Sequence, residues 1–298
     1  ARRGAGLLRV EDALLRSVLP ARAGGGPPLG LQLDRGGMHF DPSTPSDLER
    51  LCAEGPLDDT ALLDRARGAM ADLRRLHLSK YTGFDPAAPV PAPGKVLVVD
   101  QTAGDASVRA SGATRDTFRE AAALAAEEHP GARLVVKSHP ETAAGHRVGH
   151  LSPGDFPGAT FLTAPVSPWH LLEGAVGVYT VSSQLGFEAI LAGHRPVVLG
   201  QPFYAGWGRT DDRRPLNRRR RRLTRAQLFA AAMILHPTWY DPFGDRLCTL
   251  EEAIAIIAAE TRAWRDDRHG WIATSMRLWK RRPLQDVFGR AGKVGFVD

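Results

Sequence analysis

Short apolar runs and amphipathic stretches alternate between residues 95 and 200 of the chain. The apolar runs predict buried strands at 96–99, 133–136, 160–162, 176–181 and 196–199. The stretches between them predict helices at 114–128, 168–173 and 185–192. Alternation of strand and helix is typical of right-handed βαβ units. The pattern therefore predicts an α/β fold with a Rossmann-like, doubly wound parallel sheet and helices on both faces.

Different patterns flank this region. Before it we expect a strand at 7–10, a hairpin of 31–33 with 38–40, and helices at 46–52 and 58–78. After residue 223 the pattern is helical, with helices at 224–235 and 249–264. The proline-rich segment 87–94 has the composition of a linker. We therefore expect three contiguous parts, which are 1–92, 93–240 and a helical segment 241–298.

The composition is that of a globular protein, with 43% hydrophobic and 24% charged residues among 298. No apolar run is long enough to cross a bilayer, and no signal peptide precedes the first predicted strand. Cys52 and Cys248 lack the spacing of metal ligands, which indicates free thiols in a reducing compartment. We expect a cytoplasmic protein. Because the chain opens on Ala1 rather than Met, we also expect a piece of a longer polypeptide.

The net charge of +6 is concentrated locally, since seven arginines lie from Arg213 to Arg222. Such a run usually forms a solvated surface, and it can also bind anionic lipid headgroups. Nucleic acid is a third candidate, but the chain shows no nucleic-acid-binding module and no aromatic residues interleaved with the arginines. We therefore expect a solvated or membrane-surface run and no nucleic acid partner.

Polar side chains follow two of the predicted strands, at the edge where open parallel sheets bind ligands. Asp105 lies after 96–99 among small residues that leave room for a ligand, although a lone Asp more often caps a helix. Lys137 and His139 follow 133–136, and Pro140 holds His139 extended. Both side chains suit a phosphate, and His can protonate a leaving group. The alternative is a surface Lys and a structural His.

Two further strand ends supply polar groups. Ser182, Ser183 and Gln184 open the helix at 185–192, and such a helix start binds anions, although one serine suffices for a cap. Glu188 lies one turn further on and could bond a ribose diol or stay solvated. The loop 200–208 (GQPFYAGWG) can cradle a base or sugar, or simply pack. Together the four strand ends predict one site with a carboxylate, a His, a Lys, a phosphate-binding helix start and an aromatic loop.

Several classes of site are excluded by motif. No Gly-x-Gly-x-x-Gly loop follows the strand at 96–99, no Walker A pattern occurs, and no Gly-x-Ser-x-Gly elbow occurs. No Asp-x-Asp pair exists, so a divalent metal bound as in many nucleotide-diphosphate sugar transferases has no support. A donor with a single phosphate needs less help from a cation. We expect neither a metal nor a cofactor.

Several stretches carry a family resemblance that covers nearly the whole chain. They are YTVSSQLGFEA at 179–189, GQPFYAGWG at 200–208, RVED at 9–12 with Arg16 and Ser17, DLE at 47–49, Asp100 and Gln101 with Asp105, and RLT at 222–224 with LHP at 235–237. These stretches resemble the capsule polysaccharide synthesis proteins of the KpsC/KpsS type. The GQPFYAGWG stretch is very specific, and the His-Pro and Ser-Ser pairs are shared with bacterial sialyltransferases that also use CMP donors.

The resemblance implies a retaining β-Kdo transferase of GT-B-like architecture that uses CMP-Kdo. In that family a carboxylate is the nucleophile, and Asp105 is the matching position. His139 would contact the donor phosphate with Ser182 and Ser183, and Glu188 would bind the ribose. The remaining matched positions on the donor side are Lys137, Pro140, Gln184, Gln201 and Tyr204, and those on the acceptor side are Arg9, Glu11, Asp12 and Arg16.

The resemblance also implies partners. The acceptor would be a capsule glycolipid of the lyso-phosphatidylglycerol type at the inner membrane, to which the enzyme adds a poly-Kdo linker as a peripheral protein. A second transferase module would lie in the same polypeptide. The chain departs from the family at Ala13, where the family has Gly, and it has less sequence before Arg9. We therefore expect the acceptor-side region 1–92 to be incomplete.

Two alternatives remain open from the sequence. Another CMP-sugar transferase, similar to the sialyltransferases, would use the same phosphate-binding groups. A non-catalytic module that binds membranes or polyanions would instead depend on the arginine run.

Overall fold

The computed structural model describes residues 7–267. Contacts between Cα atoms divide the chain into two compact units, neither of which is continuous in sequence. The parallel-sheet unit comprises Gly36–Pro56 and Pro86–Leu228. Of the described residues, the antiparallel-sheet unit comprises 7–35, Leu57–Asp85 and 229–267. These two units differ from the three contiguous parts predicted from the sequence. A linker-like composition does not show which distant segments of the chain pack together.

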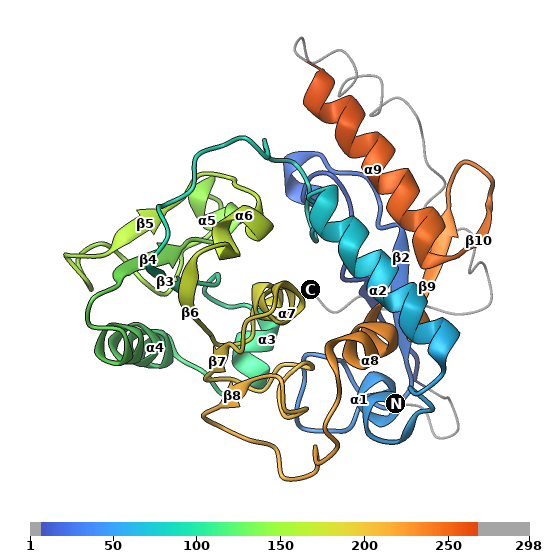
Figure 1. Cartoon of the computed structure of the whole chain (residues 1–298), viewed down its shortest axis with the longest axis horizontal. Coiled ribbons are helices and arrows are strands. Elements are labelled where there is room, and N and C mark those ends of the chain that lie inside the picture. The colour runs from blue at the N-terminus through green and yellow to red at the C-terminus, as the bar shows by residue number, and fades with distance from the viewer. Residues whose placement is uncertain (1–6, 268–298) are drawn as a thin grey trace. The chain divides into compact units, whose positions relative to one another are not determined.

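Six parallel strands form the sheet of the first unit (Figure 1). They are β3 (Lys95–Val99), β4 (Arg133–Lys137), β5 (Thr160–Leu162), β6 (Ala175–Thr180), β7 (Val197–Val198) and β8 (Asp211–Asp212). Their order is β5-β4-β3-β6-β7-β8, and all neighbours are parallel. Counted along the chain this is the Rossmann order 3-2-1-4-5-6, with its switch point between β3 and β6. The predicted doubly wound parallel sheet is confirmed, and β8 is added to it.

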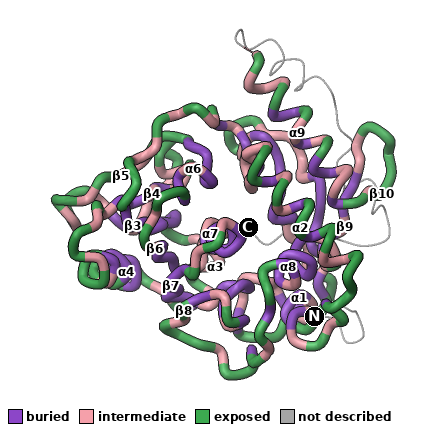
Figure 2. The backbone as a smooth tube through the Cα atoms, in the orientation of Figure 1, coloured by how far each residue is buried: buried purple, intermediate pink, exposed green. Residues whose placement is uncertain are grey.

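Helices cover both faces of this sheet. The helices of this unit are α1 (Asp47–Glu54), α3 (Ala106–Ala110), α4 (Arg115–Glu128), α5 (Pro140–Ala143), α6 (Pro168–Leu172) and α7 (Gln184–Ala192). Val96 of β3 shares an apolar cluster with Phe118 of α4, whereas the next residue, Leu97, shares another with Leu171 of α6. Successive side chains of a strand point to opposite faces. Figure 2 shows α4 buried toward the strands and exposed on its other side.

The second unit holds a four-stranded antiparallel sheet of order β1-β2-β9-β10. Its strands are β1 (Arg9–Asp12), β2 (Gly30–Asp34), β9 (Pro237–Asp241) and β10 (Arg246–Cys248), and its helices are α2 (Thr60–Arg75), α9 (Leu250–Asp266) and the short η1 (Ala21–Ala23). The chain passes between the units through α8 (Arg225–Phe229) and the π-helical η2 (Ala230–Leu235). Both segments lie within the single helix predicted at 224–235.

Two predictions for this sheet are wrong. Residues 31–33 do not pair with 38–40, which form no strand; β2 pairs instead with β1 and β9. The segment from 241 was expected to be helical, but β9 ends and β10 lies within it before α9 begins. A periodic pattern identifies β2 as a strand without showing a partner two hundred residues away. Pairing with β9 explains why residue 30 is a glycine, because a Cβ there would lie 2.5 Å from the Trp239 ring.

Candidate active site

Two loops meet at the switch point of the parallel sheet, one after β3 and one after β6. The Gln101 side chain bridges them, since its Nε2 donates to Ser182 Oγ at 3.1 Å and its Oε1 accepts from Ser182 N at 3.0 Å. Gln101 is buried, so this bridge is a fixed part of the fold. The crevice where a Rossmann-type sheet binds its ligand is therefore bordered by the residues that follow these two strands.

Asp105 is the N-cap of α3. The helix-capping role considered from the sequence is therefore confirmed for its Oδ1 oxygen. Its Oδ1 accepts from Ser107 N at 2.8 Å, Ser107 Oγ at 2.6 Å and Val108 N at 3.4 Å. Within residues 7–267 all hydrogen bonds of the Asp105 side chain end on Oδ1, which leaves Oδ2 for a ligand. Ser107 Oγ also lies 2.9 Å from Ser182 Oγ. Asp105, Ser107 and Ser182 thus form a hydrogen-bonded chain across the switch point.

Asp100 fixes the loop that carries Asp105. Its carboxylate accepts from the backbone N–H groups of Gln101, His150 and Leu151 at 2.9, 3.1 and 3.3 Å. Burial raises the pKa of Asp100, and these N–H groups oppose that rise. Gly149 is required beside it, because a Cβ there would lie 2.3 Å from Asp100 Oδ2. The sequence did not show the hydrogen bond of Ser107 to Asp105 or the anchoring role of Asp100, although both residues lie in the loop that it identified.

Lys137 is the last residue of β4, the strand beside β3, and His139 follows two positions later. Lys137 Nζ donates to Ala164 O at 3.2 Å, and burial lowers the pKa of Lys137 to about 8. His139 is the N-cap of α5 and Pro140 its first residue; His139 Nδ1 accepts from Glu141 N at 3.2 Å. A neutral imidazole that accepts at Nδ1 carries its proton on Nε2. His139 therefore has a capping role and also a defined donor atom.

The two serines after β6 have different roles. Ser183 caps α7, accepting from Leu185 N at 3.3 Å, whereas Ser182 faces Gln101 and Ser107. Gln184 is the first residue of α7. Glu188 is only 6% exposed, so the expectation that it might be a solvated helix residue is wrong.

The aromatic loop supports α7 from the side. Tyr204 is fully buried and donates its hydroxyl proton to Ser183 O at 2.6 Å, and burial raises its pKa. Gly186 leaves the space for that ring, since a Cβ there would lie 2.2 Å from the Tyr204 hydroxyl. Gln201 Nε2 donates to Arg214 O at 3.1 Å. The loop thus packs against the start of α7, and Tyr204 positions Ser183.

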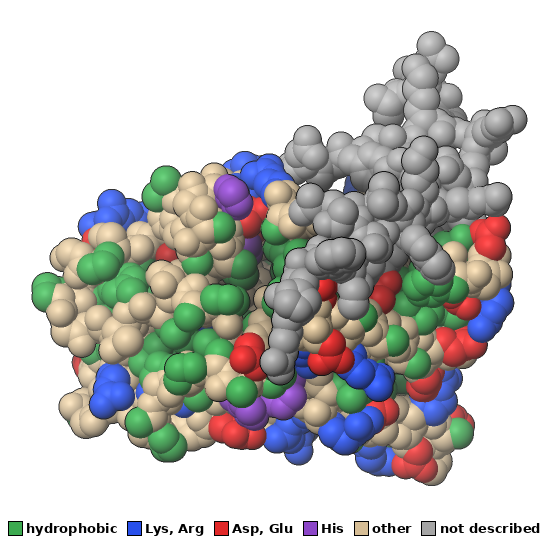
Figure 3. Space-filling model, turned by 90° about the horizontal axis from the view of Figure 1, so that it is seen from above, with side chains coloured by type: hydrophobic (Ala, Val, Ile, Leu, Met, Phe, Trp, Pro, Cys, Tyr) green, Lys and Arg blue, Asp and Glu red, His purple; other side chains and the backbone are tan. Residues whose placement is uncertain are grey.

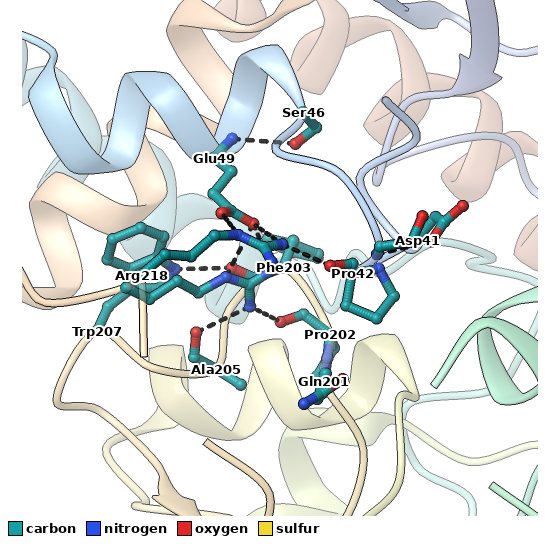
Figure 4. Close-up of polar contacts among 12 residues, drawn as sticks. Asp41, Pro42, Ser46, Glu49, Gln201, Pro202, Phe203, Ala205, Trp207 and Arg218 are labelled. Atoms are coloured by element: carbon teal, nitrogen blue, oxygen red, sulfur yellow. Dashed lines mark hydrogen bonds and ion pairs between the residues drawn. The ribbon is translucent and has the colours of Figure 1, made fainter. Parts of the chain in front are cut away.

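The arginine run is largely a structural element, and the prediction of a solvated or membrane-surface run is wrong for its central part. Glu49 of α1 accepts hydrogen bonds from both Arg218 and Arg219 (Figure 4). The Arg219 side chain is 3% exposed and also donates to Pro202 O at 2.5 Å and Ala205 O at 3.0 Å. These contacts tie the loop 200–208 to α1, an arrangement that charge composition cannot show.

Surface charge is mixed in the view of Figure 3, where blue Lys and Arg side chains lie among red Asp and Glu side chains. Some of the charged side chains form ion pairs with one another; Arg115 and Arg119, for example, both bind Asp155. No helix within residues 7–267 combines the length and the apolar character needed to cross a membrane. In that same range no three His, Cys, Asp or Glu side chains are grouped so that they could hold a metal ion.

The four residues predicted for the acceptor side all lie in the antiparallel-sheet unit. Arg9, Glu11 and Asp12 belong to β1, and Arg16 pairs with Asp12 and donates to Ser17 Oγ at 2.9 Å. Burial raises the pKa of Glu11. Their role toward an acceptor stays a prediction.

Fold and site together define a Rossmann-type α/β unit with a cluster of polar side chains at its switch point. The chain belongs to the family described as capsule polysaccharide biosynthesis protein, which matches residues 86–238. This confirms the resemblance seen in the sequence.

Curated relatives include the lipopolysaccharide-processing protein LpsZ of Rhizobium meliloti, 39% identical over 85% of this chain and 59% of the relative. The capsule polysaccharide modification protein LipA of Neisseria meningitidis is 34% identical over 94% of this chain and 42% of the relative. The chain thus spans about half the length of these relatives.

Two solved structures from Thermosulfurimonas dismutans share the fold. One, KpsC, β-Kdo 2,4 transferase, has a TM-score of 0.78 and 37% identity, covering 84% of this chain and 79% of that one. The other, KpsC, β-Kdo 2,7 transferase, has a TM-score of 0.69 and 27% identity, covering 87% and 79%.

Proposed function

We propose that the chain is a retaining β-Kdo glycosyltransferase that transfers Kdo from CMP-Kdo to a capsule glycolipid of the lyso-phosphatidylglycerol type. The observation that carries this proposal is the hydrogen-bonded chain from Asp105 through Ser107 to Ser182 at the switch point. It combines a carboxylate that has one oxygen held and one available with a helix start suited to phosphate. The β-Kdo transferases of the same fold support the choice of sugar.

The anomeric carbon of Kdo is quaternary and bears a carboxylate, so departure of CMP passes through an oxocarbenium-like state. Asp105 Oδ2 forms a bond to this carbon while the bond to the phosphate oxygen breaks and CMP leaves with the electron pair. The acceptor hydroxyl then attacks the same carbon, its proton passes to solvent water, and the bond to Asp105 breaks with the electron pair returning to the carboxylate. Two inversions retain the configuration.

The groups around Asp105 would stabilise the departing phosphate. His139 Nε2–H and the Lys137 ammonium are donors at a neighbouring strand end, and the Ser182 hydroxyl would donate to the phosphate in place of Ser107. Charge-assisted hydrogen bonds to a developing anion lower the barrier. Glu188 would bind the ribose, with Gln184 and Gln201 beside the nucleotide. Pro140 and Tyr204 would act by positioning His139 and Ser183.

We further propose that the protein acts in the cytoplasm as a peripheral protein of the inner membrane, needs no metal or cofactor, and lies beside a second transferase module. The length of the curated relatives supports a longer polypeptide.

A donor screen tests the proposal. The protein is incubated with a lyso-phosphatidylglycerol-type acceptor and either CMP-Kdo or CMP-sialic acid, and CMP release is measured. We expect release from CMP-Kdo. Release from CMP-sialic acid alone would favour the sialyltransferase-like alternative. No release from either donor, together with liposome binding that is lost in Arg220→Gln/Arg222→Gln, would favour the non-catalytic module.

Replacing the imidazole of His139 should weaken CMP binding. His139→Asn retains a residue that caps helices well but removes the Nε2 donor. A hydrogen bond to a charged group contributes about 1.5–3 kcal/mol, so we expect the Kd for CMP to rise about tenfold or more by calorimetry. An unchanged Kd would contradict the phosphate contact.

CMP binding should weaken as pH rises through about 8, the pKa to which burial lowers Lys137. The charged ammonium that would bind phosphate predominates below this pH and is lost above it. Lys137→Arg stays charged throughout and should remove the dependence between pH 7 and 9.5. The same decline in both proteins would exclude Lys137 as its source.

A further inference from the structure

Two arginines converge on Gly104, the residue before Asp105. Arg109 Nη1 of α3 donates to Gly104 O at 2.9 Å, and Arg147 Nη2 donates to Ala103 O at 2.8 Å. The loop of Arg147 is held in place by a backbone hydrogen bond of 2.7 Å from Ala103 N to Val148 O. The two guanidinium groups therefore approach the same short segment from α3 and from the loop after α5.

Gly104 leaves a space that both guanidinium groups border. Its φ is +77°, and a Cβ would lie 3.4 Å from Arg147 Nη2 and 3.9 Å from Arg109 Nη1. Beyond the chain neighbours, no other described atom lies within 4 Å of that point. Both the backbone conformation and the open space favour glycine here.

The charges at this point are only partly balanced by protein. Arg147 has Glu141 as a distant partner, with Nη1 and Oε2 3.7 Å apart, and Arg109 makes no ion pair with the part of the chain that the structure describes. By contrast, Arg115 and Arg119 nearby share Asp155. Each guanidinium has five N–H donors, so most remain available after the bond to one carbonyl. Two such groups beside one open space favour an anion.

We propose that Arg109 and Arg147 bind the carboxylate of the donor sugar and so select acidic 2-keto sugars over neutral ones. This inference rests on the proposed function. The carboxylate is bonded directly to the anomeric carbon, which must come within about 3–3.5 Å of the attacking oxygen of Asp105. The sugar carboxylate therefore lies next to Gly104, the residue before Asp105. The phosphate leaves from the opposite side of that carbon, toward Ser182 and His139.

The carboxylate is present in both donor and transition state, so the two arginines mainly contribute to binding. A bound carboxylate also shields the developing positive charge of the sugar from the guanidinium groups. Loss of either arginine should therefore raise KM for CMP-Kdo more than it lowers kcat. CMP has no such carboxylate, and its affinity should be unchanged.

The test compares Arg109→Gln and Arg147→Gln with Arg115→Gln, an exposed arginine of α4 paired with Asp155. KM and kcat are measured with CMP-Kdo, and the Kd for CMP is measured by calorimetry. We expect KM to rise about tenfold for each of the first two variants, the equivalent of one charged hydrogen bond, with the Kd for CMP within twofold of wild type. The Arg115→Gln control should behave as wild type.

Two results would overturn the inference. An equal loss of affinity for CMP would assign the arginines to the phosphate, and an unchanged KM would remove them from the site. The Kd for CMP-Kdo is also measured in Asp105→Asn, with and without each arginine change, because this arm does not require transfer. Absence of CMP release in the wild type would count against the proposed function. The arginine proposal fails separately, in the Asp105→Asn background, if CMP-Kdo binds no more tightly than CMP. It also fails if replacing the arginines leaves the Kd for CMP-Kdo unchanged.

Discussion

Asp105→Asn should lower the rate of Kdo transfer by about a thousandfold or more while CMP binds with wild-type affinity. The amide is a poor nucleophile, so the covalent step is lost. Asn is chosen because the Asp105 carboxylate also caps α3, and Asn is among the best capping residues. Transfer is measured with CMP-Kdo and acceptor, and CMP affinity by calorimetry.

Asp105→Ala and Ser107→Ala complete the comparison. Ala removes both the nucleophile and the cap, so it should abolish transfer and also lower thermal stability. Ser107→Ala keeps the nucleophile but removes the hydroxyl that joins Asp105 to Ser182, and we expect an intermediate loss of transfer. Transfer at the wild-type rate in Asp105→Asn would exclude the carboxylate as nucleophile.

Glu49→Ala should reduce the free energy of unfolding by about 3–5 kcal/mol, the range seen when one partner of a buried ion pair is removed. Glu49 accepts from Arg218 and Arg219, and the buried Arg219 would be left without a carboxylate. The measurement is urea unfolding at neutral pH. Glu54→Ala, an exposed carboxylate of the same helix, is the matched control and should change stability by less than about 0.5 kcal/mol.

The contribution of Glu49 to the free energy of unfolding should also depend on pH. Burial alone would raise its pKa, but the hydrogen bond from Arg218 and the charge of Arg219 outweigh burial and hold it below the ordinary 4.5. A carboxylate whose pKa is lowered by folding stabilises the native state above its unfolded pKa and loses that contribution as pH falls. The difference in stability between wild type and Glu49→Ala should therefore shrink below about pH 4.5. A difference that stays constant to pH 3 would contradict this account of the cluster.

The parallel sheet could be predicted from sequence because its information is local. Most strands that follow one another in the chain are neighbours in the sheet, and the crossover from β5 to β6 at the switch point is the exception. The right-handedness of βαβ connections limits the remaining choices. The antiparallel sheet could not, because β2 joins β9 across most of the chain. The hairpin predicted at 31–33 and 38–40 failed for this reason, since Gly36 already belongs to the other compact unit.

The candidate site shows the same division. That Asp105, Lys137, His139 and Ser182 follow strands of one sheet was visible in the sequence. Side-chain geometry decides which of the two adjacent serines caps α7 and which bonds to Gln101 and Ser107. The burial of Arg219 depends on Glu49, 170 positions away in the sequence. The run of like charges in the sequence therefore predicted a solvated environment for Arg219, which is buried.

The most direct test of the central claim is intact-protein mass spectrometry after incubation with CMP-Kdo and no acceptor. The wild type should gain one Kdo-sized increment, which peptide mapping places on Asp105, and Asp105→Asn should gain none. An increment that persists in Asp105→Asn, or one mapped to another residue, would contradict a nucleophile at the switch point.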